Sequence, residues 1–121
     1  VIIMAGYLHD IGILEAERKH GSTSPRYQHQ EGPPIARQIL EKLGAAENLV
    51  SEVCDIVAHH HHPGENESLN FKVVYDADLI TNLEEEQAEE PKAKDELARI
   101  IEKAALTASG RKLAREILGL S

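Results

Sequence analysis

Hydrophobic residues recur along most of the chain at the three- and four-residue spacing of amphipathic helices. After Pro33 and Pro34 this spacing predicts a helix that Gly44 ends. A second helix is predicted over 46–60, and a third begins after Ser68, whose side chain is placed to cap it. Beyond an acidic run, two last helices are predicted within 92–121, separated or kinked at Gly110. Since nothing reads as a set of paired strands, the predicted class is all-α.

The first thirty residues contain an apolar segment and a polar segment, which predict different structures. Residues 1–10 are apolar almost all round, which is typical of a helix buried in the centre of a bundle, with Gly12 as its stop. This helix begins without a capping residue, so we expect a further segment before Val1 in the natural protein. Residues 15–28 are polar and contain Gly21 and Pro25, which predicts an exposed loop.

Length and charge narrow the classes of function. The 121 residues predict one domain over 1–121. Lys and Arg number 13 against 21 Asp and Glu, and the net charge of -8 disfavours duplex nucleic acid and anionic membranes as partners. The single Cys54 cannot form an internal disulfide, and no apolar run is long enough to span a membrane, so a cytoplasmic protein is expected.

Candidate metal ligands lie at the ends or inner faces of the predicted helices. His9 and Asp10 close the buried opening segment, where two polar groups are costly without a partner. The further candidates are His29, His59, His60 and Asp78. Imidazole and carboxylate ligands suit one or two divalent ions, such as Mn, Fe, Co, Ni, Zn or Mg, and Asp10 has a second oxygen that can bridge two of them. The competing interpretations are a buried His-Asp hydrogen bond, a solvated His29, and a hydrogen-bonded core histidine at position 60.

The order His-Asp, His, His-His, Asp over successive helices resembles the HD-domain superfamily. Residues 5–12 resemble its central helix and residues 78–82 its last metal-binding helix, so the likeness covers a metal core over 1–83, with 92–121 as C-terminal helices. The resemblance implies an HD-domain-like helical bundle with His9, Asp10 and Asp78 on one metal. It also implies that His29 and either His59 or His60 match the ligands of a second metal in the binuclear branches.

This sequence departs from the superfamily pattern in three places. The superfamily's first histidine would precede Val1. Ile13 stands where HD-GYP proteins have lysine, and Pro63-Gly64 replaces their Gly-Tyr-Pro motif, which argues against a cyclic dinucleotide substrate. The acidic pair that follows His-Asp in guanosine tetraphosphate hydrolases is also absent, since Ile13 and Leu14 occupy that stretch.

The function that this pattern predicts is hydrolysis of a small phosphorylated substrate, with nucleotides as the expected class, by metal-activated water. Asp10 and His60 are the candidate catalytic residues, His60 as a proton donor to the leaving group. Lys19 and Arg26 are candidates to bind phosphate, against the alternative of ordinary solvated charges. A di-iron oxygenase and a degenerate, non-catalytic HD binding module remain the alternatives.

The residues beside these candidates are given structural roles. His61 and His62 are predicted to face solvent. Asp76 is predicted to form a surface ion pair with Lys72, four residues before it.

Overall fold

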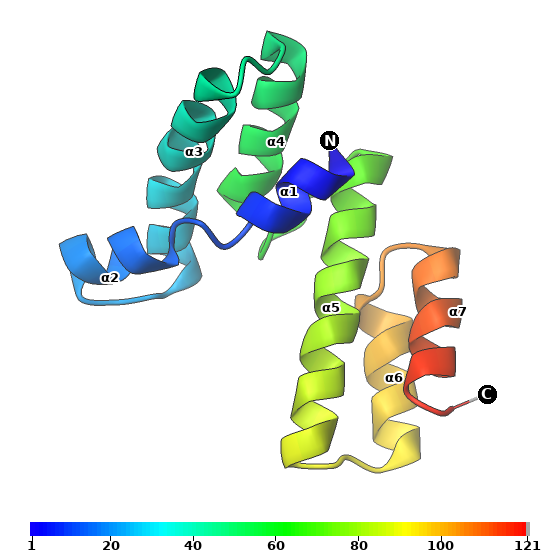
Figure 1. Ribbon diagram of the computed structural model, residues 1–121. Coiled ribbons are helices and arrows are strands. Elements are labelled where there is room, and N and C mark those ends of the chain that lie inside the picture. The colour runs from blue at the N-terminus through cyan, green and yellow to red at the C-terminus, as the bar shows by residue number, and fades with distance from the viewer. Residues whose placement is uncertain (121) are drawn as a thin grey trace. The chain divides into compact units, whose positions relative to one another are not determined.

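The computed structural model describes residues 1–120, and all regular elements in this range are helices (Figure 1). They are α1 (Ile2–Leu8), α2 (Ile13–His20), α3 (Pro25–Lys42), α4 (Glu47–His59), α5 (Leu69–Glu89), α6 (Lys94–Ala104) and α7 (Ala108–Ile117). The all-α prediction is confirmed. Ser68 caps α5 as predicted, because its hydroxyl oxygen accepts the Phe71 N–H at 3.1 Å. None of the helices within residues 1–120 has both the length and the apolarity to cross a membrane.

The chain forms two compact units, Val1–Phe71 and Lys72–Ser121, and the division falls inside α5. In the first unit, α3 and α4 lie side by side, α2 packs on α3, and α1 packs on α4 (Figure 1). The core contribution of α4 comes from apolar residues at helical spacing, as predicted. These are Val50, Val53, Ile56 and Val57.

Helix α3 runs through Pro33 and Pro34, so the predicted helix start after these residues is wrong. The first residue of α3 is Pro25, a position where a missing N–H costs nothing. Buried positions recur every four residues on both sides of the two internal prolines: Gln28, Gly32, Ala36 and Leu40. Packing of this continuous stripe outweighs the helical hydrogen bonds that the prolines cannot donate.

The segment 15–28, predicted to be an exposed loop, is also largely helical. Helix α2 covers its first part and ends at Gly21, whose φ of 65° is the left-handed conformation typical of a helix C-terminus. Pairing of Glu15 with Arg18, one turn later, stabilises the polar face of this helix. Ala16 is its buried residue, at 0% exposure. A helix that buries one small side chain has little apolar periodicity, and the sequence pattern therefore did not reveal it.

Helix α1 was predicted to be buried on all sides, but only one of its faces is buried. It buries Ala5 and Leu8, which lie three residues apart and share the face that packs on α4. Ile3 and Tyr7 lie on other faces, with 71% and 81% of their surface exposed. The prediction was wrong because hydrophobicity on every side of a short helix does not identify the side that packs.

The second unit has its own hydrophobic core, drawn from three helices. Its buried members are Ile80 and Leu83 on α5, Leu97 and Ile101 on α6, and Ala114 on α7. The last two helices are therefore present as predicted.

Asp76 is part of this second unit and is buried, not paired with Lys72 on the surface as predicted. Its carboxylate accepts the backbone N–H groups of Leu106 at 2.7 Å and Thr107 at 2.9 Å, and the Thr107 hydroxyl at 2.6 Å. The same hydroxyl oxygen caps α7 by accepting the Gly110 N–H at 2.8 Å. Gly110 thus lies in the first turn of α7, and it does not divide the two helices as predicted.

Candidate metal centre

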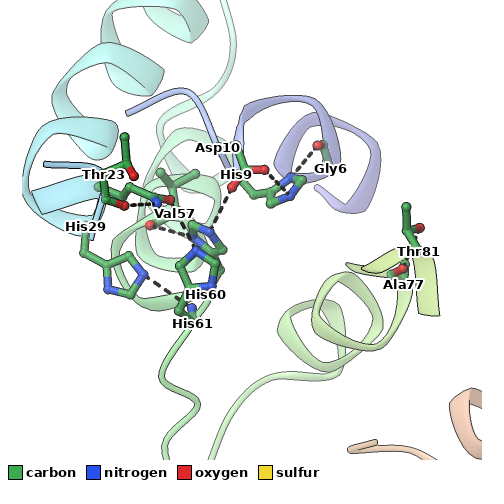
Figure 2. A network of polar contacts seen from close by, with 11 residues as sticks. Gly6, His9, Asp10, Thr23, His29, Val57, His60, His61, Ala77 and Thr81 are labelled. Atoms are coloured by element: carbon green, nitrogen blue, oxygen red, sulfur yellow. Dashed lines mark hydrogen bonds and ion pairs between the residues drawn. The ribbon is translucent and has the colours of Figure 1, made fainter. Parts of the chain in front are cut away.

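Imidazoles and a carboxylate from three segments of the first unit lie close together (Figure 2). His9 is the C-cap residue of α1, and Asp10 follows it in the turn toward α2. His29 lies on α3. His60 and His61 lie just beyond α4, where the chain leaves the helix.

Two glycines allow the backbones that carry these side chains to approach. A Cβ atom on Gly12, two residues after Asp10, would lie 2.7 Å from the backbone nitrogen of Gly32 on α3. A Cβ atom on Gly32 would in turn lie 2.8 Å from a methyl carbon of Val57 on α4. The Gly12 contact is with backbone atoms and leaves no room for a side chain, whereas a side chain at position 32 would require Val57 to shift. The two contacts set the close spacing of the three segments.

Local hydrogen bonds set the orientation of two imidazoles. The Nδ1–H of His9 donates to the carbonyl oxygen of Gly6 at 2.7 Å. The Nδ1–H of His60 donates to the carbonyl oxygen of Val57 at 3.2 Å. When a neutral imidazole donates through Nδ1, its Nε2 carries a lone pair, which is the form that binds a metal.

Both Nε2 atoms face the carboxylate of Asp10. The His9 Nε2 lies 3.2 Å from Oδ2, and the His60 Nε2 lies 3.3 Å from Oδ1. The adjacent imidazoles, His60 first and then His9, hold the pKa of the Asp10 carboxyl well below its usual range. At neutral pH this carboxyl is therefore an anion between two nitrogen atoms.

This arrangement fits a divalent cation. The His60 Nε2 is buried and has no hydrogen-bond partner, and it faces a carboxylate oxygen that is also an acceptor. A proton satisfies one such nitrogen at a time, whereas a cation satisfies both imidazoles and Asp10 together. Ligands held about 2.1 Å from one ion are themselves about 3 Å apart, close to the separations observed here.

A second group of possible ligands adjoins the first and shares His60 with it. One ligand atom from each of His29, His60 and His61 lies within 4.8 Å of the other two. The Nε2–H of His61 donates to the Gln28 side-chain oxygen at 3.2 Å, which leaves Nδ1 as the lone-pair nitrogen. The Gln28 amide is itself held by the Thr23 carbonyl oxygen at 2.5 Å.

His29 is held neutral in this group. Burial, followed by the nearby histidines, lowers the pKa of His29 to about 4. Its Nε2 accepts the backbone N–H of His61 at 3.3 Å. At neutral pH a proton therefore does not compete with a cation for this side chain.

His61 was predicted to face solvent, but it is half-buried and belongs to the group just described. Adjacent residues cannot share one face of a helix, which is why only one inward histidine was expected. The chain leaves α4 after His59, and the N–H of His62 bonds to the His59 carbonyl oxygen at 2.8 Å. This turn lets His60 and His61 both point inward, while His62 is exposed, as predicted.

Other candidate residues have different surroundings. The His59 Nε2 lies 2.9 Å from a carboxylate oxygen of Glu67, and its ring stacks on Phe71. Lys19 Nζ lies 3.1 Å from the Glu31 carboxylate. The guanidinium of Arg26 lies over the ring of Tyr27, 5.5 Å from its centre.

The last predicted ligand, Asp78, is a half-buried residue of α5. It belongs to the second unit. Its assignment as a ligand stays a prediction.

No curated protein and no solved structure was found to match the chain. The sequence profile of the HD domain, by contrast, matches residues 1–104, a range that contains every predicted ligand. The match covers most of the 121 residues and agrees with the all-α structure. The chain therefore belongs to the HD-domain family, a family of the metal-dependent hydrolase type.

Proposed function

We propose that this chain is a metal-dependent phosphohydrolase that cleaves a small phosphoester, with nucleotides as the expected substrate class. The observation that carries the proposal is the Asp10 carboxylate between the Nε2 atoms of His9 and His60. These groups are the ligand types that hold catalytic divalent metals, and the family is of the metal-dependent hydrolase type.

In this proposal His9, Asp10 and His60 would hold one ion, and Asp78 stays the further ligand that the sequence predicts. His29 and His61 would hold a second ion, with the Asp10 carboxylate as a ligand that the two ions could share. When bound, divalent ions lower the pKa of a coordinated water and neutralise charge that develops on phosphate oxygens. The Nδ1–H bonds of His9 and His60 to backbone carbonyls keep each Nε2 aimed at Asp10.

The proton for the leaving group needs a donor that is not committed to this centre. His60 uses Nδ1 on a carbonyl oxygen and faces Asp10 with Nε2, so it is poorly placed for this role. His62 is exposed, and its ring lies edge-on to His29 with 5.5 Å between ring centres. We therefore assign the proton donor to His62, in place of the His60 assignment made from the sequence.

The charge distribution favours a small anion over a long one. With a net charge of -8, most of the surface repels a polyanion. Lys19 pairs with Glu31, which offsets its charge, while Arg26 and Tyr27 present a cation beside an aromatic ring at the start of α3. The proposal therefore keeps Arg26 as the stronger of the two candidate phosphate contacts.

The test is a hydrolysis screen of the purified chain against nucleotides and model phosphoesters with Mn²⁺, Co²⁺, Ni²⁺ or Mg²⁺. We expect turnover that requires added metal and is lost in Asp10→Ala. The His62→Gln variant should keep its metal and lose much of its turnover. Metal binding without turnover of any phosphoester would contradict the proposal, and an iron-dependent absorption change on exposure to oxygen would favour the oxygenase alternative.

A further inference from the structure

The segment between the candidate metal centre and α5 is tied back onto α4 by one carboxylate. Glu67 lies near the end of this segment, and its side chain is only 12% exposed. One of its oxygens accepts the backbone N–H of Gly64 at 2.7 Å. The two oxygens also lie 2.9 Å and 3.1 Å from the Nε2 of His59. A single side chain thus joins the last residue of α4 to the middle of the segment that follows it.

The imidazole of His59 is held from a second side. Its ring stacks on that of Phe71, with 4.9 Å between centres and 17° between planes. Phe71 is 1% exposed and is fixed at the start of α5 by the Ser68 cap. His59 therefore connects the end of α4 to the start of α5, with Glu67 on its Nε2.

This connection determines which members of the run of four histidines reach the centre. His59 points to Glu67 and Phe71, whereas His60 and His61, the next two residues, belong to the ligand group with His29. Because His59 immediately precedes them, holding its side chain in place restrains the backbone from which His60 and His61 project. A change of about 1 Å in that exit would spoil ligand positions that must match within a few tenths of an ångström.

We propose that Glu67 and His59 form a positioning pair that orients His60 and His61 toward the metal centre without binding the metal. The inference rests on the proposed function only for the existence of the centre. The Glu67 side chain accepts the Gly64 backbone N–H and also reaches His59. Both contacts together require a carboxylate or an amide at position 67.

Cobalt(II) binding to the full chain tests this pair, because the visible spectrum of cobalt reports ligand geometry independently of hydrolysis. Glu67→Ala should lower Co²⁺ affinity by about tenfold, the lower end of the effect of losing an outer partner of a metal ligand, and should alter the spectrum. Glu67→Gln keeps an oxygen for the Gly64 N–H and an amide for His59, so it should restore most of the affinity. Glu65→Ala, an exposed neighbour in the same segment, is the matched control and should bind as the parent chain does.

Stoichiometry separates a positioning role from a ligand role. Glu67→Ala and His59→Gln should both bind the parent number of ions at saturating Co²⁺, and loss of an ion from His59→Gln would overturn the proposal by making His59 a ligand. Unchanged affinity and spectrum in Glu67→Ala would also overturn it. If Glu67→Ala does not fold, Glu67→Asp, whose side chain is shorter by one methylene, is measured with the same expectations.

A parent chain that binds no Co²⁺ would overturn both the positioning pair and the proposed function. Co²⁺ binding without phosphoester hydrolysis would overturn only the proposed function.

Discussion

Gly12 and Gly32 are in backbone contact, and a Cβ atom on Gly12 would lie 2.7 Å from the nitrogen and 2.9 Å from the Cα of Gly32. It would also lie 2.6 Å from the carbonyl oxygen of Gln28. All three of these neighbours are backbone atoms of α3, which cannot swing aside as a side chain can. The turn after Asp10 is therefore held against the helix that carries His29 by a contact that admits no side chain at position 12.

Gly12→Ala should destabilise the protein and disturb the metal centre. Moving α3 away to admit one methyl group is an overpacking change, for which about 1–3 kcal/mol of unfolding free energy is expected. Urea unfolding and Co²⁺ affinity are the measurements. Gly6→Ala on α1 is the control, because its Cβ would have no neighbour within 4 Å and alanine favours a helix. Equal stability of the two variants would show that the contact is not tight in solution.

Helices whose apolar residues recur at helical spacing were predictable from the sequence. Helices stabilised mainly by ion pairs or by packing around prolines were not. Helix α4 buries Val50, Val53 and Val57 at helical spacing, and the same pattern placed His60 inward, where it is 4% exposed. Helix α2 was missed because it is stabilised by exposed ion pairs and by burial of the small side chain of Ala16, neither of which gives an apolar pattern. The start of α3 was misplaced because Pro33 normally ends a helix, and local preference does not include the packing on both sides of it.

The candidate site was predictable to a similar extent. His9, Asp10, His29 and His60 were recognised by residue type at helix ends, and the structure brings them together. His61 was missed because its orientation depends on where α4 ends, and helix ends are the least predictable feature of a pattern. Asp76 was misread because its partners are backbone N–H groups of Leu106 and Thr107, thirty residues further along the chain.

Asp76→Ala should destabilise the second unit. Its carboxylate accepts three hydrogen bonds at the start of α7, and hydrogen bonds to a charged group are stronger than average. Removal should cost about 2–3 kcal/mol of unfolding free energy, measured by urea unfolding. Glu102→Ala, an exposed acid on α6, is the control and should change stability by less than about 0.5 kcal/mol. A similar small change in Asp76→Ala would contradict the capping role.

The metal-free protein should lose stability as the pH falls from about 6.5 to about 4, partly through His29. Burial lowers the pKa of His29 from 6.5 to about 4, so the unfolded chain binds more protons than the folded chain between these values. Stability therefore rises with pH across this window, is complete above it, and falls as the pH approaches 4. Protonation would also remove the acceptor for the His61 N–H.

The measurement is urea unfolding in chelator at several pH values, for the parent chain and for His29→Asn. The variant has no imidazole to protonate, so its stability should fall less steeply between pH 6.5 and 4. The carboxylates with lowered pKa values act mainly at the acid end and are common to both proteins; they are Asp10, Glu15, Glu31 and Glu67. Parallel pH profiles for the two proteins would exclude His29 as a contributor.

The number of metal ions per chain decides between a mononuclear and a binuclear centre. His60 is shared by the two groups of ligands, since it faces Asp10 and also lies among His29 and His61. Its Nε2 is its one lone-pair nitrogen and can bind one ion, so His60→Ala should lose about one ion per chain. The double variant His29→Ala, His61→Ala leaves His9, Asp10 and His60 intact, so it should drop from about two ions to about one and lose most hydrolytic activity.

Asp78→Ala probes the ligand predicted from the sequence in the second unit. If Asp78 completes the first site, this variant should lose the ion that the double histidine variant retains, and combining all three changes should leave no bound ion. Elemental analysis of protein purified without chelator gives each count, with Asp95→Ala on α6 as an acidic control. Full metal content in Asp78→Ala would remove it from the ligand set. A count of about one ion in both the parent and the double histidine variant would make the centre mononuclear, because His9, Asp10 and His60 alone would then account for the bound metal.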